Sequence, residues 1–364
     1  MRRRADKKGP LKKIVVFQNA KLGDMVCTTP VFRTLKRGLP DIHVCVAGDS
    51  VNGLLLEENA DVDEYFVAGK SLWRTIFFLR RRRFDAAFLV APSPDVLAAL
   101  YLSGVPLVVA PRLVDGGSPY QTQSYRMLLR FVVSVPHHIG RYAPREYLRV
   151  LEPIGIVSED TTKYLGFSLA AKNLVSDFFK DRGIDYAQSL VVGITPSAGN
   201  KMKLWPCERF AAVADFLYDR YSAHIIIVGG KNDIKEIQEM VQALKPATPY
   251  IVAQDFSIDE LKALVSKLSL VIGVDTGIIY IAEAFGVPTI DIVGPVDDAD
   301  QPPRGEKHAI VKAPRIKAAM GVMNNIPVDI SEMIRQSDDI TVAMVCKAIE
   351  PMISKTASFP RLRI

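Results

Sequence analysis

A turn of three residues, Asp275-Thr276-Gly277, is the segment whose residue types and spacing are best suited to chemistry. It follows an apolar stretch, Leu270 to Gly273, and precedes a short helical pattern from Ile278 to Phe285. A hydroxyl, a glycine backbone and unpaired N–H groups at a helix start suit phosphate, because the N–H groups and the helix dipole favour negative charge. The same pattern is typical of a plain Rossmann-like turn in which Thr276 caps the helix. Both interpretations stay open at this stage.

The elements around this turn form one unit of a longer alternating pattern. A second apolar strand, Thr289 to Val293, completes a strand–helix–strand unit of a parallel sheet. Further strands, with helical patterns between them, are expected at 14–17, 42–47, 65–67, 86–90, 107–109, 190–194, 225–228 and 250–252. This alternation predicts an α/β fold with two doubly wound parallel sheets, one in each half of the chain.

The predicted organisation has four parts. They are a basic tail over 1–12, an N-terminal Rossmann-like domain over 13–168, a C-terminal Rossmann-like domain over 186–337, and a C-terminal helix and tail over 338–364. Whether the last part packs back on the N-terminal domain is left open. Residues 112–146 are polar and interrupted by glycine and proline, which predicts a long functional loop before a helix from Arg145 to Ile154. Pro30 either begins the first helix or lies inside it.

Composition limits the class of protein without identifying it. With 364 residues, 49% hydrophobic and 24% charged, the chain is typical of a globular protein with two cores. The net charge of +6 is compatible with an anionic small ligand, a membrane surface or nucleic acid. We interpret the run Arg80 to Arg83 as a helix terminus and expect no nucleic-acid partner. The four cysteines form no Cys-x-x-Cys pair, which favours a reducing compartment over a zinc site or a disulfide framework.

Targeting signals are not predicted. No apolar segment follows the basic residues after Met1, and the longest apolar run, Val96 to Ala110, is too short to span a bilayer. We therefore expect a cytoplasmic protein. Residues 1–13 contain seven Lys or Arg, which leaves open a tether of this tail to anionic lipid.

Four motifs occur in a specific order. They are KLGD (Lys21–Asp24), TPSAGNKMKLWP (Thr195–Pro206), VGGKND (Val228–Asp233) and DTG (Asp275–Gly277). Each motif alone is weak, but their order and spacing over residues 12 to 350 resemble glycosyltransferase family 9, the bacterial heptosyltransferases of the lipopolysaccharide inner core. The resemblance implies a GT-B fold, in which two Rossmann-like domains face an inter-domain cleft. It also implies metal-independent, inverting transfer from a nucleotide sugar, by default ADP-heptose, with no further cofactor.

The partners implied are the nucleotide sugar and a glycan acceptor, either lipid-linked or part of the lipopolysaccharide core. Contact with the cytoplasmic face of the inner membrane stays open. Inverting transfer needs a base beside the acceptor hydroxyl, and we expect Asp24 in that role because its loop follows the first strand. Lys21 and Gly23 of the same loop are expected at the acceptor. The alternative for Asp24 is a helix cap.

The donor side needs positive charge and fixed hydrogen-bond donors for the departing nucleoside diphosphate. Lys203 matches the lysine that the family has before Trp-Pro and is expected to contact a phosphate, whereas Trp205 is expected in the core. The residues expected at the donor are Ser197, Lys203, Gly229, Gly230, Asp233, Phe256, Asp275, Thr276, Gly277 and Tyr280. Of these, Asp233 would reach a ribose hydroxyl, and Phe256 would contact the nucleobase or be an ordinary core residue.

Two positions depart from the family pattern. Tyr280 stands where the family has histidine, which leaves the donor sugar open. The segment Val90 to Ser93 stands where relatives often carry an Asp-x-Gln-like strand end, which leaves the acceptor open. Asp298 and Asp300 resemble the D-x-D motif of metal-dependent glycosyltransferases, but we interpret them as part of a loop and expect no metal site.

Two other functions remain as alternatives. One is a catalytically inactive GT-B relative that binds a nucleotide or a glycan. The tyrosine at position 280, where the family has histidine, suggests this alternative. The other is a non-hydrolysing nucleotide-sugar epimerase, which also pairs two Rossmann-like domains. The presence of both Asp24 and Lys203 favours the transferase.

Overall fold

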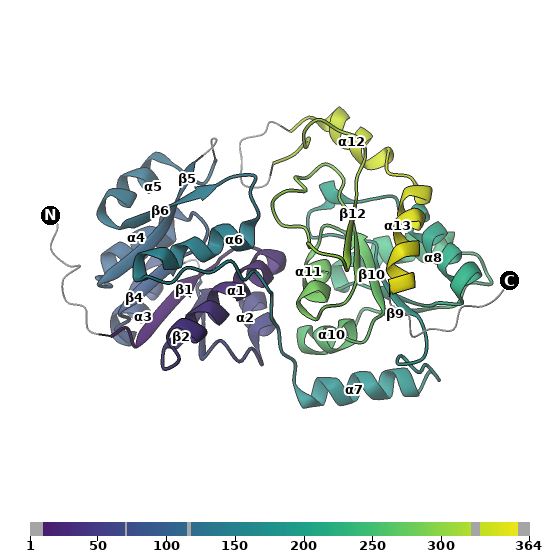
Figure 1. Cartoon of the computed structure of the whole chain (residues 1–364), viewed down its shortest axis with the longest axis horizontal. Helices are drawn as coiled ribbons and strands as arrows, with labels where there is room; N and C mark the ends of the chain where they lie inside the picture. The colour runs from purple at the N-terminus through teal and green to yellow at the C-terminus, as the bar shows by residue number, and fades with distance from the viewer. Residues whose placement is uncertain (1–9, 70, 115–117, 322–327, 356–364) are drawn as a thin grey trace. The chain divides into compact units, whose positions relative to one another are not determined.

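The chain forms two compact units (Figure 1). The computed structural model describes residues 10–69, 71–114, 118–321 and 328–355. The first unit contains the chain up to Gly166 together with Ala299–Gln301, and Phe167–Asp298 belongs to the second. The predicted basic tail lies outside the described residues up to residue 9, and so does the C-terminal tail from residue 356 onward.

The first unit is built on a parallel sheet of six strands. Its order is β3-β2-β1-β4-β5-β6, which is the order of a doubly wound Rossmann fold. The strands are β1 (Lys13–Phe17), β2 (His43–Gly48), β3 (Glu64–Val67), β4 (Ala86–Leu89), β5 (Leu107–Val114) and β6 (Val133–His138). Ile14, Val15, Val16 and Phe17 are all fully buried, because helices cover both faces of a parallel sheet and its central strands are apolar throughout.

The helices of the first unit follow the strands in alternation. They are α1 (Leu22–Gly38), α2 (Ser50–Leu56), α3 (Leu72–Arg82), α4 (Pro94–Ser103), α5 (Gln123–Leu128), η1 (Leu129–Phe131), α6 (Ala143–Leu148) and η2 (Arg149–Ile154). The question about Pro30 is answered by α1, which begins at Leu22 and contains Pro30 in its interior.

The predicted long loop over residues 112–146 is wrong. Strand β5 continues to Val114, and β6 runs from Val133 to His138 with α5 between them. β6 is an edge strand that pairs with β5 alone, and Val133 and Ser134 are exposed. An edge position tolerates Pro136, because a proline there removes no hydrogen bond between central strands. A half-exposed strand with proline therefore looks like a loop in the sequence.

The second unit repeats the same topology. Its sheet has the order β12-β11-β10-β7-β8-β9, and all described pairings are parallel. The strands are β7 (Val191–Thr195), β8 (His224–Val228), β9 (Tyr250–Ala253), β10 (Leu270–Val274), β11 (Thr289–Ile292) and β12 (His308–Val311). The helices are α7 (Leu169–Lys180), η3 (Lys201–Lys203), α8 (Cys207–Tyr221), η4 (Lys231–Asp233), α9 (Ile234–Ala243), α10 (Ile258–Val265), α11 (Gly277–Ala284), α12 (Ile330–Asp338) and α13 (Val342–Lys355).

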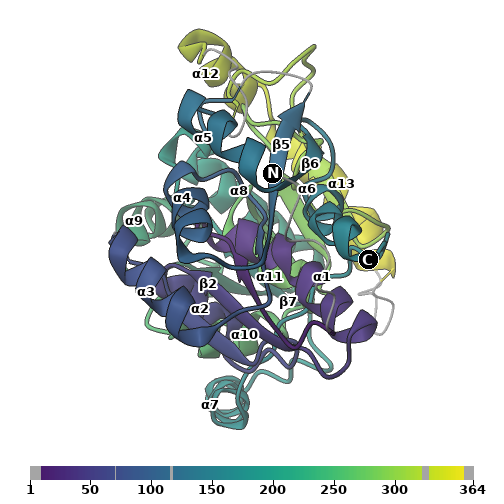
Figure 2. The same ribbon diagram turned by 90° about the vertical axis from the view of Figure 1, so that its left-hand side faces the viewer.

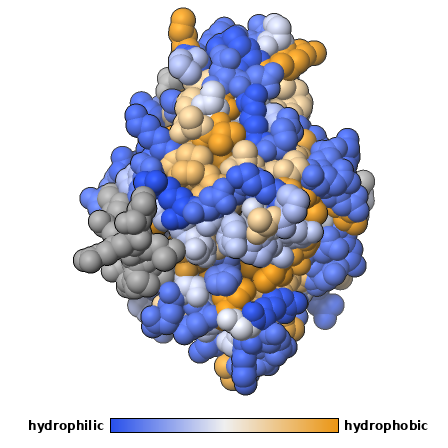
Figure 3. Space-filling view, turned by 90° about the vertical axis from the view of Figure 1, so that its right-hand side faces the viewer, coloured by the Kyte–Doolittle hydropathy of each residue, from blue (hydrophilic) through white to orange (hydrophobic). Residues whose placement is uncertain are grey.

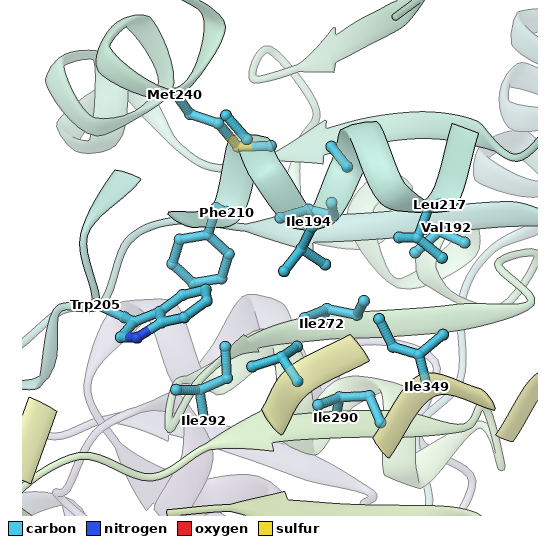
Figure 4. Packing of buried hydrophobic residues seen from close by; sticks show 14 of the residues in the cluster. Val192, Ile194, Trp205, Phe210, Leu217, Met240, Ile272, Ile290, Ile292 and Ile349 are labelled. Atoms are coloured by element: carbon cyan, nitrogen blue, oxygen red, sulfur yellow. The ribbon is translucent and has the colours of Figure 1, made fainter. Parts of the chain in front are cut away.

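A hydrophobic core fills one side of the second sheet (Figure 4). Trp205 lies in this core with Phe210 at its edge, and its indole Nε1 donates to the carbonyl of Ile340 at 2.9 Å. The expectation that Trp205 is a core residue is therefore confirmed. Val345 and Ile349 of α13 belong to the same core, so the described part of the C-terminal helix packs in the second unit.

The surface is mixed in character. Figure 3 shows one side of the molecule on which hydrophilic residues prevail and apolar residues are interspersed among them. Within the described ranges, no helix combines the length and the apolar character that crossing a bilayer requires.

A close approach of β10 to β7 gives a test of the sheet packing. A Cβ at Gly273 would lie 2.2 Å from Cγ2 of Thr195 and 3.2 Å from its carbonyl oxygen, so Gly273→Ala displaces the Thr195 side chain or the strand that carries it. We expect the free energy of unfolding to fall by about 1–3 kcal/mol, as measured by urea unfolding.

Gly199→Ala is the matched control, because a Cβ there meets no described atom within 4 Å. Equal stability of the two variants would contradict the packing described here.

Candidate functional site

The two central strands of the second sheet define its candidate site. β7 and β10 are neighbours, with Thr195 paired to Gly273, and the chain order of the sheet reverses between them. In doubly wound sheets, ligands bind outside the carboxyl ends of the strands at such a reversal. The loop after Thr195 and the turn after Val274 both begin there, so the structure brings two of the four sequence motifs together.

Lys203, Asp275 and Tyr280 form a hydrogen-bonded cluster at this edge. Lys203 lies in η3, and its Nζ is 2.5 Å from Oδ2 of Asp275. The hydroxyl of Tyr280, on the second turn of α11, donates to Oδ1 of the same carboxylate. The Lys203 side chain is 16% exposed and Tyr280 is 2% exposed. The cluster therefore fixes one ammonium group beside the start of α11.

Thr276 occupies the N-cap position of α11, but its side chain makes no capping hydrogen bond. A helix-capping role thus agrees with the position of Thr276. It does not account for the hydroxyl, which makes no capping hydrogen bond. The first turn of a helix presents backbone N–H groups without intrahelical partners, and its dipole favours an anion. Lys203, Thr276 and Gly277 together supply the positive charge, hydroxyl and amides that a phosphate requires.

A second network joins the Thr195–Pro206 motif to the Val228–Asp233 motif. Ser197 donates from Oγ to Oδ1 of Asp233 at 2.5 Å, and Lys201 donates from Nζ to Ser197 Oγ at 2.8 Å. Lys201 also pairs with Glu236 at 2.8 Å. Oδ2 of Asp233 accepts from the backbone N–H of Gly230 at 2.8 Å. Asp233, expected to reach a ribose hydroxyl, therefore holds the Gly229-Gly230 loop in the described structure.

Gly229 and Gly230 follow β8 and allow this loop to approach α9. A Cβ at Gly229 would lie 2.9 Å from Cδ1 of Ile237 and 3.2 Å from Cβ of Asp233. Sequence reasoning missed Lys201, although it belongs to the same motif as Lys203. The sequence could have indicated Lys201, because the two lysines are two residues apart in a segment that follows a central strand.

The ring contact described for Phe256 is with a residue outside these clusters. It is half-buried after β9, and its ring meets the ring of Phe178 on α7 edge-on with centroids 5.2 Å apart. Ser257 and Glu260 then form a capping box that begins α10. The contact with Phe178 agrees with the core alternative for Phe256, and the nucleobase contact stays a prediction.

Asp291 is a site residue that the sequence did not single out. It lies in β11 opposite Gly273, and it is 1% exposed. Neither of its carboxyl oxygens has a hydrogen-bond partner in the described part of the chain. Burial, reinforced by the Asp275 carboxylate and opposed by the Lys203 ammonium, raises the pKa of Asp291 well above its usual value. Asp291 therefore keeps its proton to a higher pH than an ordinary carboxyl group.

The first unit places Asp24 in a separate cluster. Asp24 is the third residue of α1, whose N-cap is the exposed Lys21, so Asp24 does not occupy the cap position. Gln301 donates from Nε2 to Oδ1 of Asp24 at 2.6 Å, and the hydroxyl of Tyr147 lies 3.4 Å from the same oxygen. Burial, together with the nearby Asp24 and Asp300 carboxylates, raises the pKa of the Tyr147 hydroxyl well above its usual value, so this hydroxyl remains a donor.

Gly23 is buried beside Asp24, whereas Lys21 is exposed. Both stand at the carboxyl end of β1, the strand next to β4 where the chain order of the first sheet reverses. The sequence analysis did not identify Tyr147 and Gln301 as site residues. They lie 123 and 277 residues from Asp24 along the chain and belong to no motif.

Asp298, the first acidic residue of the D-x-D sequence, forms ion pairs with basic side chains of the protein. Asp298 pairs with Lys312 at 2.5 Å and with Arg315 at 2.7 Å. The Arg315 side chain, 3% exposed, also donates to the carbonyls of Gly294 and Val296, so it fixes the loop after β11. Among the residues that the structure describes, no group of three His, Cys, Asp or Glu is arranged to hold a metal ion.

Comparison with known proteins gives consistent matches. Residues 117–326 match the sequence profile of glycosyltransferase family 9 (heptosyltransferase). Lipopolysaccharide heptosyltransferase 3 of Escherichia coli is 26% identical over 289 residues, which are 76% of this chain and 81% of the relative.

Solved structures show the same fold. A glycosyl transferase of family 9 from Veillonella parvula superposes with a TM-score of 0.77 at 21% identity, over 94% of this chain and 98% of that chain. The Escherichia coli ADP-heptose lipopolysaccharide heptosyltransferase II has a TM-score of 0.73 at 17% identity, over 95% and 100% of the two chains. The prediction of a GT-B fold with two Rossmann-like parallel-sheet domains is confirmed.

The buried Asp291 gives a pH-dependent prediction. Its pKa is raised in the folded state, so the folded protein binds more protons than the unfolded chain above about pH 3.9, and stability is lost as pH rises towards the folded-state pKa. Asp291→Asn removes this titration. We expect the stability of the variant relative to the wild type to increase by up to about 1.4 kcal/mol for each pH unit in that window.

Urea unfolding of both proteins at about pH 5 and about pH 6 measures this difference, since all other titrating groups are shared. A stability difference that is the same at both pH values would show that Asp291 titrates normally.

Proposed function

Because this chain belongs to glycosyltransferase family 9 and is a glycosyltransferase, we propose that it transfers heptose from ADP-heptose to a glycan of the lipopolysaccharide core. The proposed reaction inverts the anomeric centre and uses no metal ion. The donor follows the Escherichia coli relative described as an ADP-heptose heptosyltransferase, and the acceptor follows the relatives named as lipopolysaccharide heptosyltransferases.

The observation that carries the proposal is the Lys203–Asp275–Tyr280 cluster at the carboxyl end of β10. An ammonium group has three N–H donors, so Lys203 can keep its contact with Asp275 and still donate to a phosphate oxygen. The backbone amides at the start of α11 and the Thr276 hydroxyl can donate hydrogen bonds to an anion, and the helix dipole favours negative charge there. In this proposal they stabilise the diphosphate as it leaves, which is where negative charge develops in the transition state.

The proposed role of Tyr280 follows from its contact. Its hydroxyl donates to Asp275, and Asp275 in turn holds Lys203. We therefore assign Tyr280 to the support of the phosphate-binding lysine, in addition to its expected position at the donor. A tyrosine can do this as a hydrogen-bond donor without titrating near neutral pH.

The acceptor side rests on Asp24. The acceptor hydroxyl gives its proton to the Asp24 carboxylate while its oxygen forms the new bond to the anomeric carbon. The bond between that carbon and the diphosphate oxygen breaks, and ADP leaves with the electron pair. Gln301 and Tyr147 both contact Oδ1 of Asp24, and these contacts restrain the position of that oxygen. A fixed base contributes more than a mobile one, because its geometry needs no adjustment during proton transfer.

The donor half of the proposal is tested by calorimetric titration with ADP, with GDP and UDP as comparison ligands. ADP should bind more tightly than the other two nucleotides. Lys203→Ala removes a charge-assisted hydrogen bond worth about 1.5–3 kcal/mol, so the Kd for ADP should rise about 10- to 150-fold.

Lys172→Ala, an exposed lysine on α7, is the matched control and should leave the Kd unchanged. An unchanged Kd in Lys203→Ala would remove the phosphate-binding role of Lys203, and equal binding of the three nucleotides would remove the ADP assignment.

The catalytic half is tested by Asp24→Asn, which keeps the size of the side chain and removes its ability to accept a proton as a base. Turnover with ADP-heptose and a core-glycan acceptor should fall by about 10²- to 10⁴-fold. ADP binding should persist, because the donor residues belong to the second unit.

Asp95→Asn is the control, since Asp95 is an exposed acidic residue in the first turn of α4. Wild-type turnover in Asp24→Asn would exclude Asp24 as the base. Loss of ADP binding along with turnover would indicate a structural role instead.

A further inference from the structure

The positive charge of the chain is concentrated in one part of the first unit. Residues 66–145 contain eleven Lys or Arg and three Asp or Glu, a net charge of +8, whereas the whole chain carries +6. The remaining residues are therefore slightly acidic as a group. A concentration of one sign on one part of a surface creates a local potential that attracts the opposite charge.

Helix α3 carries apolar side chains on its exposed side. Trp73 is 74% exposed and Phe77 is 66% exposed, and a spacing of four residues puts them on one face of the helix. Ile76 and Leu79 point into the protein and are buried. Two large aromatic side chains on the outer face of a helix are unusual for a surface that contacts only water.

The exposed apolar surface continues onto the neighbouring helices. Arg80 at the end of α3 donates from Nη2 to the carbonyl of Leu102 in α4 at 2.9 Å. Tyr101, next to Leu102, has its ring 5.3 Å from the ring of Phe131, which is 58% exposed. Figure 2 shows α3, α4 and α5 following one another along one side of the first unit. We call this surface the aromatic–arginine face, and its apolar members are Trp73, Phe77, Tyr101, Leu102, Met127 and Phe131.

Arginines with uncompensated charge accompany these side chains. Arg81, Arg126 and Arg130 are exposed and form no ion pair with any described carboxylate. Arg82 differs, because it pairs with Glu64. Asp85 accepts from the backbone N–H groups of residues 12 and 13, and Asp95 is exposed in the first turn of α4. These carboxylates offset part of the positive charge, but basic residues still outnumber acidic ones by eleven to three over residues 66–145.

We propose that the aromatic–arginine face docks on the surface of an anionic lipid bilayer. Aromatic side chains partition favourably into the headgroup region, where the apolar ring leaves water, and arginines beside them meet the lipid phosphates. The combination of apolar side chains with uncompensated positive charge matches such a surface. A soluble polyanion would use the charge and leave the apolar side chains in water. This docking is independent of the proposed transferase function and does not require it.

Trp73 provides a direct readout of docking. The chain has two tryptophans, and the other, Trp205, is 2% exposed in the core of the second unit. Adding vesicles of phosphatidylglycerol and phosphatidylcholine should shift the emission to shorter wavelength and protect it from a soluble quencher. Vesicles of phosphatidylcholine alone should do so much less, and added salt should weaken the effect, because exposed charges are screened.

Two full-length variants test the two parts of the face by vesicle co-sedimentation. Phe77→Ser with Phe131→Ser removes apolar area and should lower partitioning by at least about tenfold. Arg81→Glu with Arg130→Glu should lower it by at least about fivefold for each arginine. The matched control is Val157→Ser with Leu169→Ser, which changes two residues that are 78% and 69% exposed outside the face.

The basic tail is the competing explanation for vesicle binding. A full-length variant with Arg2→Glu, Arg3→Glu and Arg4→Glu should retain the shift in Trp73 emission. The proposal is overturned if vesicles bind while Trp73 emission stays unchanged, or if the face variants partition like the control. It is also overturned if heparin shifts Trp73 emission and vesicles do not.

Discussion

A parallel sheet places the carboxyl ends of all its strands at one edge, and this constraint determines where chemistry can occur in both units. In the second unit, β7 and β10 lie side by side at the centre, so the segments after them emerge next to each other. Lys203 and Asp275 are 72 residues apart in the chain and form an ion pair because of this arrangement. In the first unit, Asp24 follows β1, which lies at the corresponding reversal of strand order.

The same constraint explains how much could be predicted from the sequence. Continuous apolar runs indicated ten of the strands, and the motifs could be placed because each follows such a run. β6 and β12 were missed, because both are edge strands with partly exposed residues and therefore lack that signal. β6 also contains Pro136. Asp291 was missed for a different reason. Its strand was predicted from Thr289 to Val293, but the sequence of one strand does not show whether an acidic side chain within it is buried, because that depends on the neighbouring strands.

Contacts across long stretches of chain were beyond sequence reasoning. The Gln301 amide meets Asp24 only in the folded unit, and nothing near Gln301 in the sequence indicates a partner. For Tyr280, the sequence indicated the position but not the contact. Its position was singled out by a departure from the family pattern, but its hydrogen bond to Asp275 follows from the geometry of the first turns of α11. Burial raises the pKa of Asp291 beside this cluster, so this carboxyl group favours its neutral form more than an ordinary carboxyl group does.

The segment Ala299–Gln301 has a consequence for how the protein can be divided. This segment belongs to the first unit, although the chain before it lies in the second. The first unit is therefore not encoded by one continuous piece of the gene. A fragment ending at Gly166 would contain Asp24 without its hydrogen bond from Gln301. Chimaeras that exchange N-terminal halves between relatives would combine the acidic residue of one parent with the amide-bearing loop of the other, so the crossover must take both segments from a single parent.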